Sequence, residues 1–341
     1  MTASGPVFCF GELLIRLTAT GHVCLSELPV LQPFVGGAEA NVAAGLATLG
    51  HRVEMISVAP ENALGDAALQ ELQRRRVGTD YVCRADGRMG LYFLTPGAVH
   101  RASDIVYDRK DSAFATFDFG ALDWCALLKG AGCLHVSGVT AALGEAAYQA
   151  ALAAMKTARD LGVMVSYDGN FRPKLWAEWS ADPKTRIHDL LQEADLVFAG
   201  HKDISLVFGQ SFTGDVDPQA REKQAADVAF ALMPNLKIMA STTRTQFSAD
   251  RNQLQGHAFS RDETCHSRVY DLERIVDRIG GGDAFAAGFL DGVLRKQPLT
   301  TCVQRAIAAA CLKHAQPGDL CLVRSGDLDR FDDGSGFDVR R

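Results

Sequence analysis

Short apolar runs alternate along the chain with longer segments whose apolar residues recur at helical spacing. The short runs are typical of buried strands, and the longer segments of helices packed on one side. Strands are expected at residues 7–10, 53–59, 133–137, 163–167, 196–199 and 237–240. Helices are expected at 36–50, 64–77, 145–161, 181–193, 221–233 and 301–314. This alternation predicts an α/β fold with a central, mostly parallel sheet and helices on both faces.

Two segments interrupt the alternation, residues 13–35 and 88–116. The first reads as a short strand pair punctuated by Pro29 and Pro33, and the second contains strand-like runs at 90–94 and 105–107 around a Pro-Gly turn. We expect these segments to form a small β-sheet lid outside the main sheet. Residues 1–12, 36–87 and 117–341 then make up the α/β domain. A last edge strand is expected at 320–323, followed by a surface tail from Arg324.

Composition and charge argue against several kinds of binding partner, namely nucleic acid, a membrane and structural zinc. The net charge of −6 over 341 residues provides no basic footprint for nucleic acid. No apolar run reaches the roughly 18 to 20 residues of a membrane span, and the N-terminus lacks the pattern of a secretory signal. The nine cysteines are scattered, without zinc-ligand spacing. We therefore expect a cytoplasmic protein with reduced thiols that binds neither membrane nor nucleic acid.

The most informative stretch is residues 275–290, where three glycines, Gly280, Gly281 and Gly282, precede Asp283. Apolar residues at helical spacing follow, so a helix is expected to begin near Asp283. Glycine backbone at a helix start forms a cradle for phosphate, because the first amides are unpaired and the helix dipole is positive there. A carboxylate at that place suits a base that deprotonates an attacking hydroxyl. The alternative is a tight turn with Asp283 as an ordinary N-cap.

A second polar helix start lies far upstream, at Gly36, Gly37 and Asn41. Two glycines and an asparagine at an exposed helix mouth could hydrogen-bond sugar hydroxyls. An ordinary capped turn would have the same residues.

Both stretches resemble signatures of the ribokinase-like carbohydrate kinases. Asp-Arg-Ile-Gly-Gly-Gly-Asp-Ala-Phe is similar to the family's Asp-Thr-x-Gly-Ala-Gly-Asp-x-Phe, and residues 36–43 match Gly-Gly-x-x-x-Asn-x-Ala. The resemblance covers essentially the whole chain, lid included. It implies a ribokinase-like fold, ATP and Mg²⁺, Asp283 as catalytic base, and Gly280, Gly281 and Gly282 as the anion hole for the transferred phosphoryl group. It also implies a homodimer through the exposed face of the lid.

Residues 87–93, 107–109, 168–176 and 275–279 resemble segments of 2-keto-3-deoxygluconate kinases, and this resemblance implies a sugar acid as substrate. Arg16 stands where sugar kinases of the family often have an aspartate. Arg109 and Arg172 could pair with a carboxylate, because guanidinium groups bind carboxylates with two hydrogen bonds. Tyr92 and Tyr107 could supply hydroxyls and an apolar wall. The alternatives are surface ion pairs for the arginines and lid packing for the tyrosines.

The nucleotide side departs from the family pattern. The resemblance implies that Asp203 takes the place of the glutamate of the family's Asn-x-x-Glu, which is tied to the metal, although Gly200 replaces its asparagine. Ser241 and Arg244 stand where the family has Lys-Leu-Gly-x-x-Gly, so we expect them at the nucleotide. The resemblance also implies that Ala309 and Lys313 lie on the helix bordering the adenine pocket.

These features predict an ATP-dependent kinase that phosphorylates the terminal hydroxyl of a sugar acid, best 2-keto-3-deoxygluconate. The first rival is a neutral-sugar kinase similar to fructokinases. The second is a non-catalytic sugar-binding protein on the same fold, which the altered nucleotide motifs favour and the intact Gly-Gly-Gly-Asp disfavours. No Gly-x-Gly-x-x-Gly follows the first strand, so a dinucleotide-binding fold is unsupported.

Overall fold

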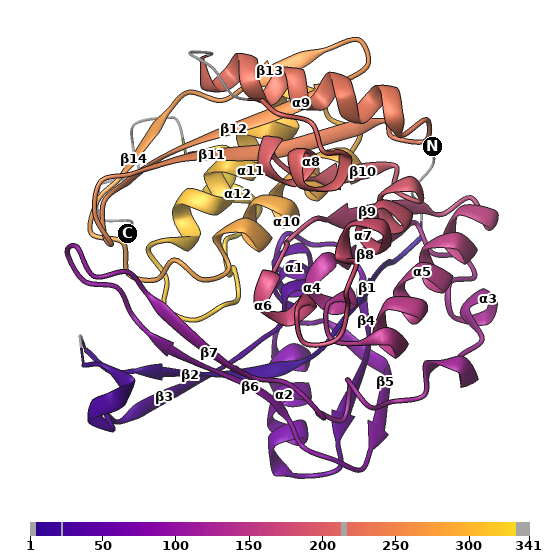
Figure 1. Cartoon of the computed structure of the whole chain (residues 1–341), viewed down its shortest axis with the longest axis vertical. Coiled ribbons are helices and arrows are strands. Elements are labelled where there is room, and N and C mark those ends of the chain that lie inside the picture. The colour runs from indigo at the N-terminus through magenta and orange to yellow at the C-terminus, as the bar shows by residue number, and fades with distance from the viewer. Residues whose placement is uncertain (1–4, 22, 213–216, 332–341) are drawn as a thin grey trace.

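The computed structural model describes residues 5–21, 23–212 and 217–331, and two β-sheets organise this part of the chain (Figure 1). The strands of the larger sheet are β1 Val7–Phe10, β4 Val53–Pro60, β5 Gly78–Ala85, β8 Cys133–Ser137, β9 Met164–Asp168, β10 Leu196–Phe198, β11 Ile238–Gln246, β12 Asn252–Ser260, β13 Thr264–His266 and β14 Tyr270–Leu272. Their order is β13-β12-β11-β10-β9-β8-β1-β4-β5, and β14 also pairs with β12. Pairing is parallel from β11 to β5, whereas β12 is antiparallel to its three neighbours. The predicted mostly parallel sheet is confirmed.

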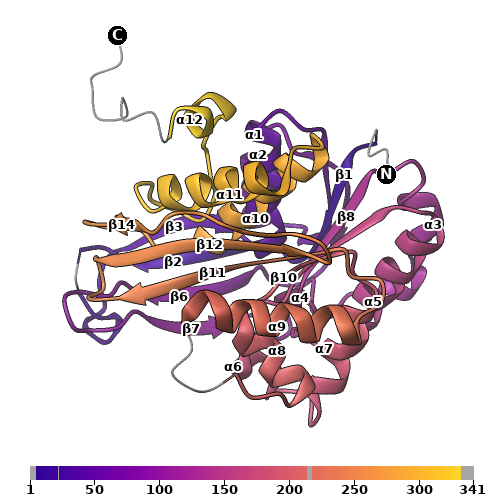
Figure 2. The same ribbon diagram turned by 90° about the horizontal axis from the view of Figure 1, so that it is seen from above.

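Helices cover both faces of this sheet (Figure 2). One face carries α1 Ala38–Thr48, α2 Ala63–Arg74, α10 Gly281–Leu294 and α11 Leu299–Lys313. The other carries α3 Trp124–Leu127, α5 Glu145–Asp160, α7 Pro183–Gln192, α8 His201–Phe208 and α9 Pro218–Leu232. Short helices are α4 Gly138–Ala141, α6 Pro173–Trp176 and α12 Ser325–Asp329. In β1, Phe8 and Phe10 pack into the core below α5, and Val7 and Cys9 into the core below α1 and α10. Because side chains alternate along a strand, one apolar run serves both cores.

The smaller sheet comes from the two segments that interrupt the alternation. Its strands are β2 Leu14–Ala19, β3 Leu31–Gly36, β6 Gly90–Thr95 and β7 Asp104–Asp108, in the order β3-β2-β6-β7. At its tip, the amide of Ala249 in the turn between β11 and β12 donates to the carbonyl of Val99 at 3.0 Å. This small sheet, which the lid prediction anticipated, therefore reaches across to the far end of the large sheet (Figure 1).

Some local predictions were wrong. Strands β5, β12, β13 and β14 were not predicted, because polar and charged residues interrupt their apolar patterns. Residues 320–323 form no strand: Leu320, Cys321 and Val323 are buried in an irregular segment under α11. The tail begins with α12, and the predicted surface course beyond residue 331 lies outside the described residues, as do residues 1–4. No helix in the described ranges is both long and apolar enough to cross a bilayer.

Candidate active site

Two cavities of about 430 Å³ each meet at the N-terminus of α10. The small-sheet cavity lies between that helix start and strands β6 and β7, and the β11 cavity lies between it and strand β11. The walls of both include Asp168, Asn170, Arg172 and Gly282. Two small molecules bound in these cavities would therefore touch at Gly282. The site lies beyond the carboxyl ends of parallel strands, where ligands of α/β sheets usually bind.

Asp283 stands in the first turn of α10 and lines the small-sheet cavity. The amide nitrogen Nδ2 of Asn41, in the first turns of α1, donates to Oδ2 of Asp283 at 2.6 Å. The two helix starts singled out in the sequence therefore meet, although 242 positions separate these residues. Burial raises the pKa of Asp283 to about 6, while the Asn41 hydrogen bond and the charges of Arg172 and Lys313 act to lower it. Such a pKa suits a general base that works near neutral pH.

The three glycines ahead of Asp283 have different surroundings. Gly280 has φ 79°, and a Cβ there would lie 2.0 Å from the carbonyl oxygen of Asp319. A Cβ on Gly281 would lie 2.8 Å from Cε1 of His314, whereas nothing lies within 4 Å of one on Gly282. The loop is thus packed tightly from behind and open towards the cavities. The first amides of a helix have no intrahelical acceptor, so those of this turn are available to an anion.

The walls of the small-sheet cavity include the predicted residues Gly37, Tyr92, Tyr107, Arg109 and Arg172. Two of them are already engaged. The hydroxyl of Tyr92 donates to Oδ2 of Asp319 at 2.7 Å, and Nε of buried Arg109 donates to Oε2 of Glu12 at 2.6 Å.

Free positive charge in this cavity comes from other residues. Neither Arg172 nor Arg278 forms an ion pair with any part of the chain that the structure describes, and both line the cavity. Arg172, rather than Arg109, is therefore the predicted arginine whose guanidinium has no ion-pair partner among the described residues and can bind an anionic ligand.

Four predicted site residues lie away from both cavities. Arg16 is fully buried beside Asp277 and Asp319, and Lys313 is fully buried behind the glycine loop. Ala309 packs in a small apolar cluster on α11, and Gly36 is buried, with room for no Cβ because Asp319 lies 2.6 Å from that position. Direct contact of these residues with a sugar or nucleotide was therefore the wrong expectation. The sequence pattern placed these residues in segments near the site, but it could not show that they do not face a cavity.

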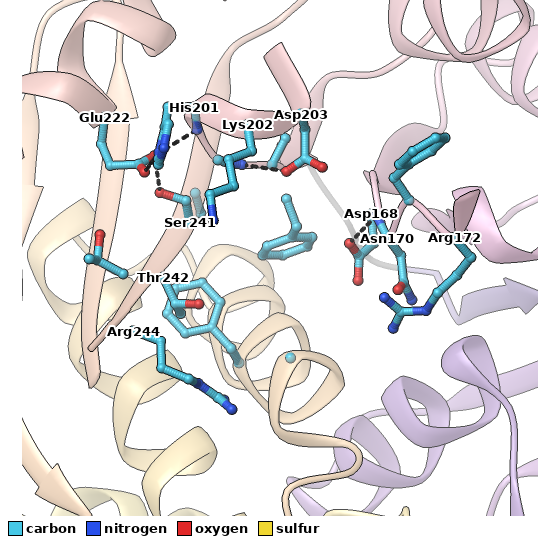
Figure 3. A pocket seen from close by; sticks show the side chains of 18 residues that line it. Asp168, Asn170, Arg172, His201, Lys202, Asp203, Glu222, Ser241, Thr242 and Arg244 are labelled. Carbon is cyan, nitrogen blue, oxygen red and sulfur yellow. Dashed lines mark hydrogen bonds and ion pairs between the residues drawn. The ribbon is translucent and has the colours of Figure 1, made fainter. Parts of the chain in front are cut away.

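Strand β11 supplies one wall of the β11 cavity through Ser241 and Arg244, as predicted for the nucleotide side (Figure 3). Nη2 of Arg244 lies 3.3 Å from Nε2 of His314, whose Nδ1 is 2.6 Å from the carbonyl of Ala310. A neutral histidine that donates from Nδ1 can accept from Arg244 at Nε2, and burial lowers the pKa of His314 to about 4. Desolvation, together with the nearby Arg278, lowers the pKa of Arg244 to about 10. His314 thus orients a cationic side chain at the cavity.

The opposite wall of the β11 cavity is the start of α8. Asp203 caps this helix, because its Oδ2 accepts from the amide of Gly200 at 2.8 Å. Buried Glu222 joins the helix to β11: its Oε1 lies 2.6 Å from Nδ1 of His201, and its Oε2 accepts from Oγ of Ser241 at 3.0 Å. Figure 3 shows these groups along one side of the cavity. The altered Asn-x-x-Glu segment therefore still forms an ordered, capped helix start.

Asp168 was not predicted as a site residue. It ends β9, lines both cavities, and has its pKa raised by burial and by the negative charges of Asp283 and Asp203. Asn170, Arg278 and His314 were missed as well. A signal for Asp168 and Asn170 existed: the polar run Asp-Gly-Asn stands at the carboxyl end of a buried strand of a parallel sheet. Nothing in the sequence pattern indicated that His314 packs against the glycine loop.

Comparison with known proteins agrees with this arrangement. The profile of the pfkB family carbohydrate kinases matches residues 6–321. The chain is 30% identical to 2-dehydro-3-deoxygluconokinase of Bacillus subtilis over 91% of its length and 90% of that protein. It is 29% identical to 2-dehydro-3-deoxygalactonokinase of Haloferax volcanii over 97% of its length and 98% of that protein.

A solved structure is also similar. The crystal structure of 2-dehydro-3-deoxygluconokinase from Thermotoga maritima superimposes with a TM-score of 0.90 at 34% identity, over 96% of this chain and 98% of that one. The predicted ribokinase-like fold is therefore confirmed, small sheet included. With the match of the family profile across nearly the whole chain, the protein is a member of the pfkB family of carbohydrate kinases.

Proposed function

We propose that the protein transfers a phosphoryl group from ATP to the terminal hydroxyl of a sugar acid, with 2-keto-3-deoxygluconate (2-dehydro-3-deoxygluconate) as the best candidate. The observation that carries the proposal is the position of Asp283, beside an open glycine at the junction of two cavities. The sugar acid would occupy the small-sheet cavity, and ATP the β11 cavity. The hydroxyl and the γ-phosphate would then meet at Gly282.

In the proposed reaction, the carboxylate of Asp283 takes the proton of the attacking hydroxyl as the bond from its oxygen to the γ-phosphorus forms. The bond from that phosphorus to the leaving ADP oxygen breaks in the same displacement. Amides at the start of α10 hold the charge on the transferred group. Arg172 lines both cavities, so its guanidinium can follow that charge from donor to acceptor. The small sheet covers the acceptor and keeps water away.

Mg²⁺ fits the acidic residues of the β11 cavity. Asp168 and Asp203 both line that cavity, and each carboxylate has its pKa raised, first by burial and then by neighbouring negative charge. A cation would relieve this repulsion. In kinases the ion is commonly held by one or two carboxylates together with substrate phosphates. Asp168 and Asp203 would hold it, and it would neutralise charge on the β- and γ-phosphates.

The choice of a sugar acid rests on two arginines that line the small-sheet cavity without an ion-pair partner in the described part of the chain, Arg172 and Arg278, and on the names of the similar kinases. One of those relatives is named for the galacto epimer, so the configuration of the substrate also has to be tested. A neutral-sugar kinase is the second candidate, supported by similarity to plant fructokinases such as fructokinase-1 of rice, 27% identical.

A substrate panel tests the proposal. ATP consumption should be fastest with 2-keto-3-deoxygluconate or its galacto epimer, and slow with fructose and ribose. Arg172→Ala should raise KM for the sugar acid by roughly 10- to 100-fold, because a charged hydrogen bond is lost, and should change KM for a neutral ketose little. Arg52→Ala, at a surface arginine with 77% of its side chain exposed, is the control. An equal rise of KM for both substrates in Arg172→Ala would contradict carboxylate recognition, whereas an equal loss of kcat would reflect its part in phosphoryl transfer.

The panel also separates the non-catalytic alternative. Calorimetric binding of a sugar acid with no ATP turnover for any sugar would favour a sugar-binding protein. A cytoplasmic location and a homodimer through the small sheet stay predictions. Leu28 and Val30, 92% and 76% exposed at the edge of that sheet, support the dimer.

A further inference from the structure

A cluster of four buried charges lies behind the glycine loop, and the reaction described above does not use it. We call Arg16, Lys313, Asp277 and Asp319 the buried charge cluster. Nη1 and Nη2 of Arg16 donate to the two carboxylate oxygens of Asp277 at 3.1 and 2.5 Å, and its Nε lies 3.0 Å from Oδ1 of Asp319. Arg16 and Lys313 are fully buried, and the side chains of Asp319 and Asp277 are 2% and 12% exposed. Two cations thus balance two carboxylates.

The cluster contacts the glycine loop directly. Oδ1 of Asp277 accepts from the amide of Ile279 at 3.0 Å, immediately before the loop. The carbonyl oxygen of Asp319 lies 2.0 Å, and Cε of Lys313 3.3 Å, from the position of a Cβ on Gly280. Any movement of these groups would therefore move the backbone that begins α10.

The same cluster reaches the small sheet and the segment after α11. Arg16 belongs to β2, and the hydroxyl of Tyr92 in β6 donates to Asp319 at 2.7 Å. The amide of Gly318 donates to Oδ2 of Asp277 at 3.0 Å, and Nζ of Lys313 donates to the carbonyl of Gln316 at 3.0 Å. Three distant segments of the chain thus share one set of charges, so the base of the small sheet is fastened to the loop.

We propose that Arg16 and Lys313 are positioning residues for phosphoryl transfer, which hold the glycine loop in register with the small sheet and set the charge state of Asp283. The inference rests on the proposed function, since it gives these residues a part in that reaction. A purely structural cluster would stabilise the fold and leave the chemistry of Asp283 unchanged.

Electrostatics supports the second half of the proposal. The charges facing Asp283 come from several elements: Arg172 follows β9, Lys313 ends α11, Asp168 ends β9 and Asp319 follows α11, while Asn41 of α1 donates a hydrogen bond. Arg172 lowers the pKa of Asp283 more than Lys313 does, but it is solvent-exposed, whereas Lys313 is buried against Gly280, three residues before Asp283. Because interactions with buried charges are less screened, removing Lys313 should make Asp283 harder to ionise.

Lys313→Met tests this inference, with Arg305→Met as the matched control. Arg305 lies on the same helix, and its cation pairs with buried Asp291 in a separate cluster. A ¹³C NMR titration of the Asp283 carboxyl should show its pKa raised in Lys313→Met and unchanged in Arg305→Met. The acid limb of kcat/KM should move upward by the same amount. An unchanged pKa of Asp283 in Lys313→Met would overturn the electrostatic role.

Arg16→Lys tests the holding role without removing a charge. It retains the cation but loses the paired hydrogen bonds to Asp277. We expect kcat to fall by about 10-fold or more, because small displacements at a reacting centre are costly. The Kd for the sugar acid in calorimetry should stay within about threefold, and the amide resonances of Gly281 and Gly282 should shift. Unchanged amide resonances would overturn the inference.

The two NMR measurements need no turnover, so the failure of this inference can be told apart from the failure of the proposed function. If wild-type protein phosphorylates no sugar, the proposed function fails, and with it the catalytic part of the inference. If wild type is active and both variants keep its pH profile and kcat, only the inference fails.

Discussion

Helix α10 carries two enclosed aspartates, eight residues apart, with opposite properties. Asp283 in its first turn has a pKa raised to about 6, whereas Asp291 near its end has a pKa lowered to about 2. Burial raises the pKa of both carboxyl groups. The difference therefore comes from their partners.

Asp291 is saturated with partners. Its Oδ1 lies 2.7 Å from Nε2 of His51 and 2.7 Å from Nε of Arg295, and its Oδ2 lies 2.6 Å from Nε of Arg305. Within the described part of the chain, Asp283 accepts one side-chain hydrogen bond, from the neutral amide of Asn41, and it faces a cavity. A carboxylate surrounded by cations stabilises the fold, while one left short of partners at a cavity keeps its basicity for a substrate. The number of partners, rather than burial, therefore distinguishes Asp283, the proposed catalytic aspartate, from Asp291, which stabilises the fold.

The substitution Asp283→Asn should have the largest effect on turnover. We expect kcat to fall by about 10²- to 10⁴-fold, because the general base is lost while the shape of the side chain is kept. Steady-state kinetics with the best sugar of the panel is the measurement. Turnover close to that of wild type would remove Asp283 from the mechanism.

The same variant should gain stability. A folded-state pKa of about 6 lies above the ordinary value of 3.8, so the folded protein holds this proton more tightly than the unfolded chain. The contribution of this group is fully present below pH 3.8 and is lost as pH rises through 6. Asn has no charge to desolvate, so at pH 7.5 Asp283→Asn should raise the free energy of unfolding by about 1–3 kcal/mol. Urea denaturation measures it, and a loss of stability would argue against a carboxylate whose charged form is destabilised by burial.

Gly282→Ala should have the next largest effect. No atom lies within 4 Å of a Cβ at Gly282, so the fold should tolerate the methyl group, but that group would occupy the junction of the two cavities. We expect kcat/KM to fall by roughly 10- to 100-fold with an unchanged melting temperature. Gly280→Ala is the contrasting variant, because its Cβ would collide with Asp319, and it should lose stability as well as activity. Full activity of Gly282→Ala would place phosphoryl transfer elsewhere.

The pH dependence of kcat/KM in the wild-type protein should show a smaller effect, which also comes from the ionisation of Asp283. Because Asp283 must be ionised to accept a proton, kcat/KM should fall as pH drops through about 6, and at pH 5 it should be about tenfold below its plateau. Asp291 remains charged throughout this range, so the loss of its own ion pairs does not contribute to the limb. A flat profile between pH 5 and 8 would contradict a base with this pKa.

The sequence predicted the position of Asp283 better than it predicted the side chains that surround the glycine loop. Asp283 and Asn41 belong to two signatures in the right order, and the structure brings them to 2.6 Å. Periodicity also indicated both faces of the large sheet. Arg16 and Lys313 were misplaced, because a charged residue in a pattern is expected at a surface or a ligand, and the partners that bury them come from distant segments. Residues 320–323 were predicted as a strand, because a buried irregular segment can have the same apolar composition as a buried strand.

A substitution at Asp291 is the complementary test, because it should change stability strongly and turnover least. Asp291→Asn leaves Arg305 and His51 without their buried counter-charge. A folded pKa of about 2 means that Asp291 contributes stability above pH 3.8, which is lost as pH falls towards 2. At pH 7.5 we expect the free energy of unfolding to fall by about 2–4 kcal/mol, since breaking a buried ion pair is costly.

In the folded fraction of Asp291→Asn, kcat should stay within about twofold of wild type, because the helix lifts this residue about 12 Å along its axis from Asp283. Asp227→Asn, at an exposed ion pair with Lys223, is the matched control and should change neither quantity much. A loss of turnover in Asp291→Asn that persists under fully folded conditions would show that the two ends of α10 are coupled, and partner number alone would then no longer separate the two aspartates.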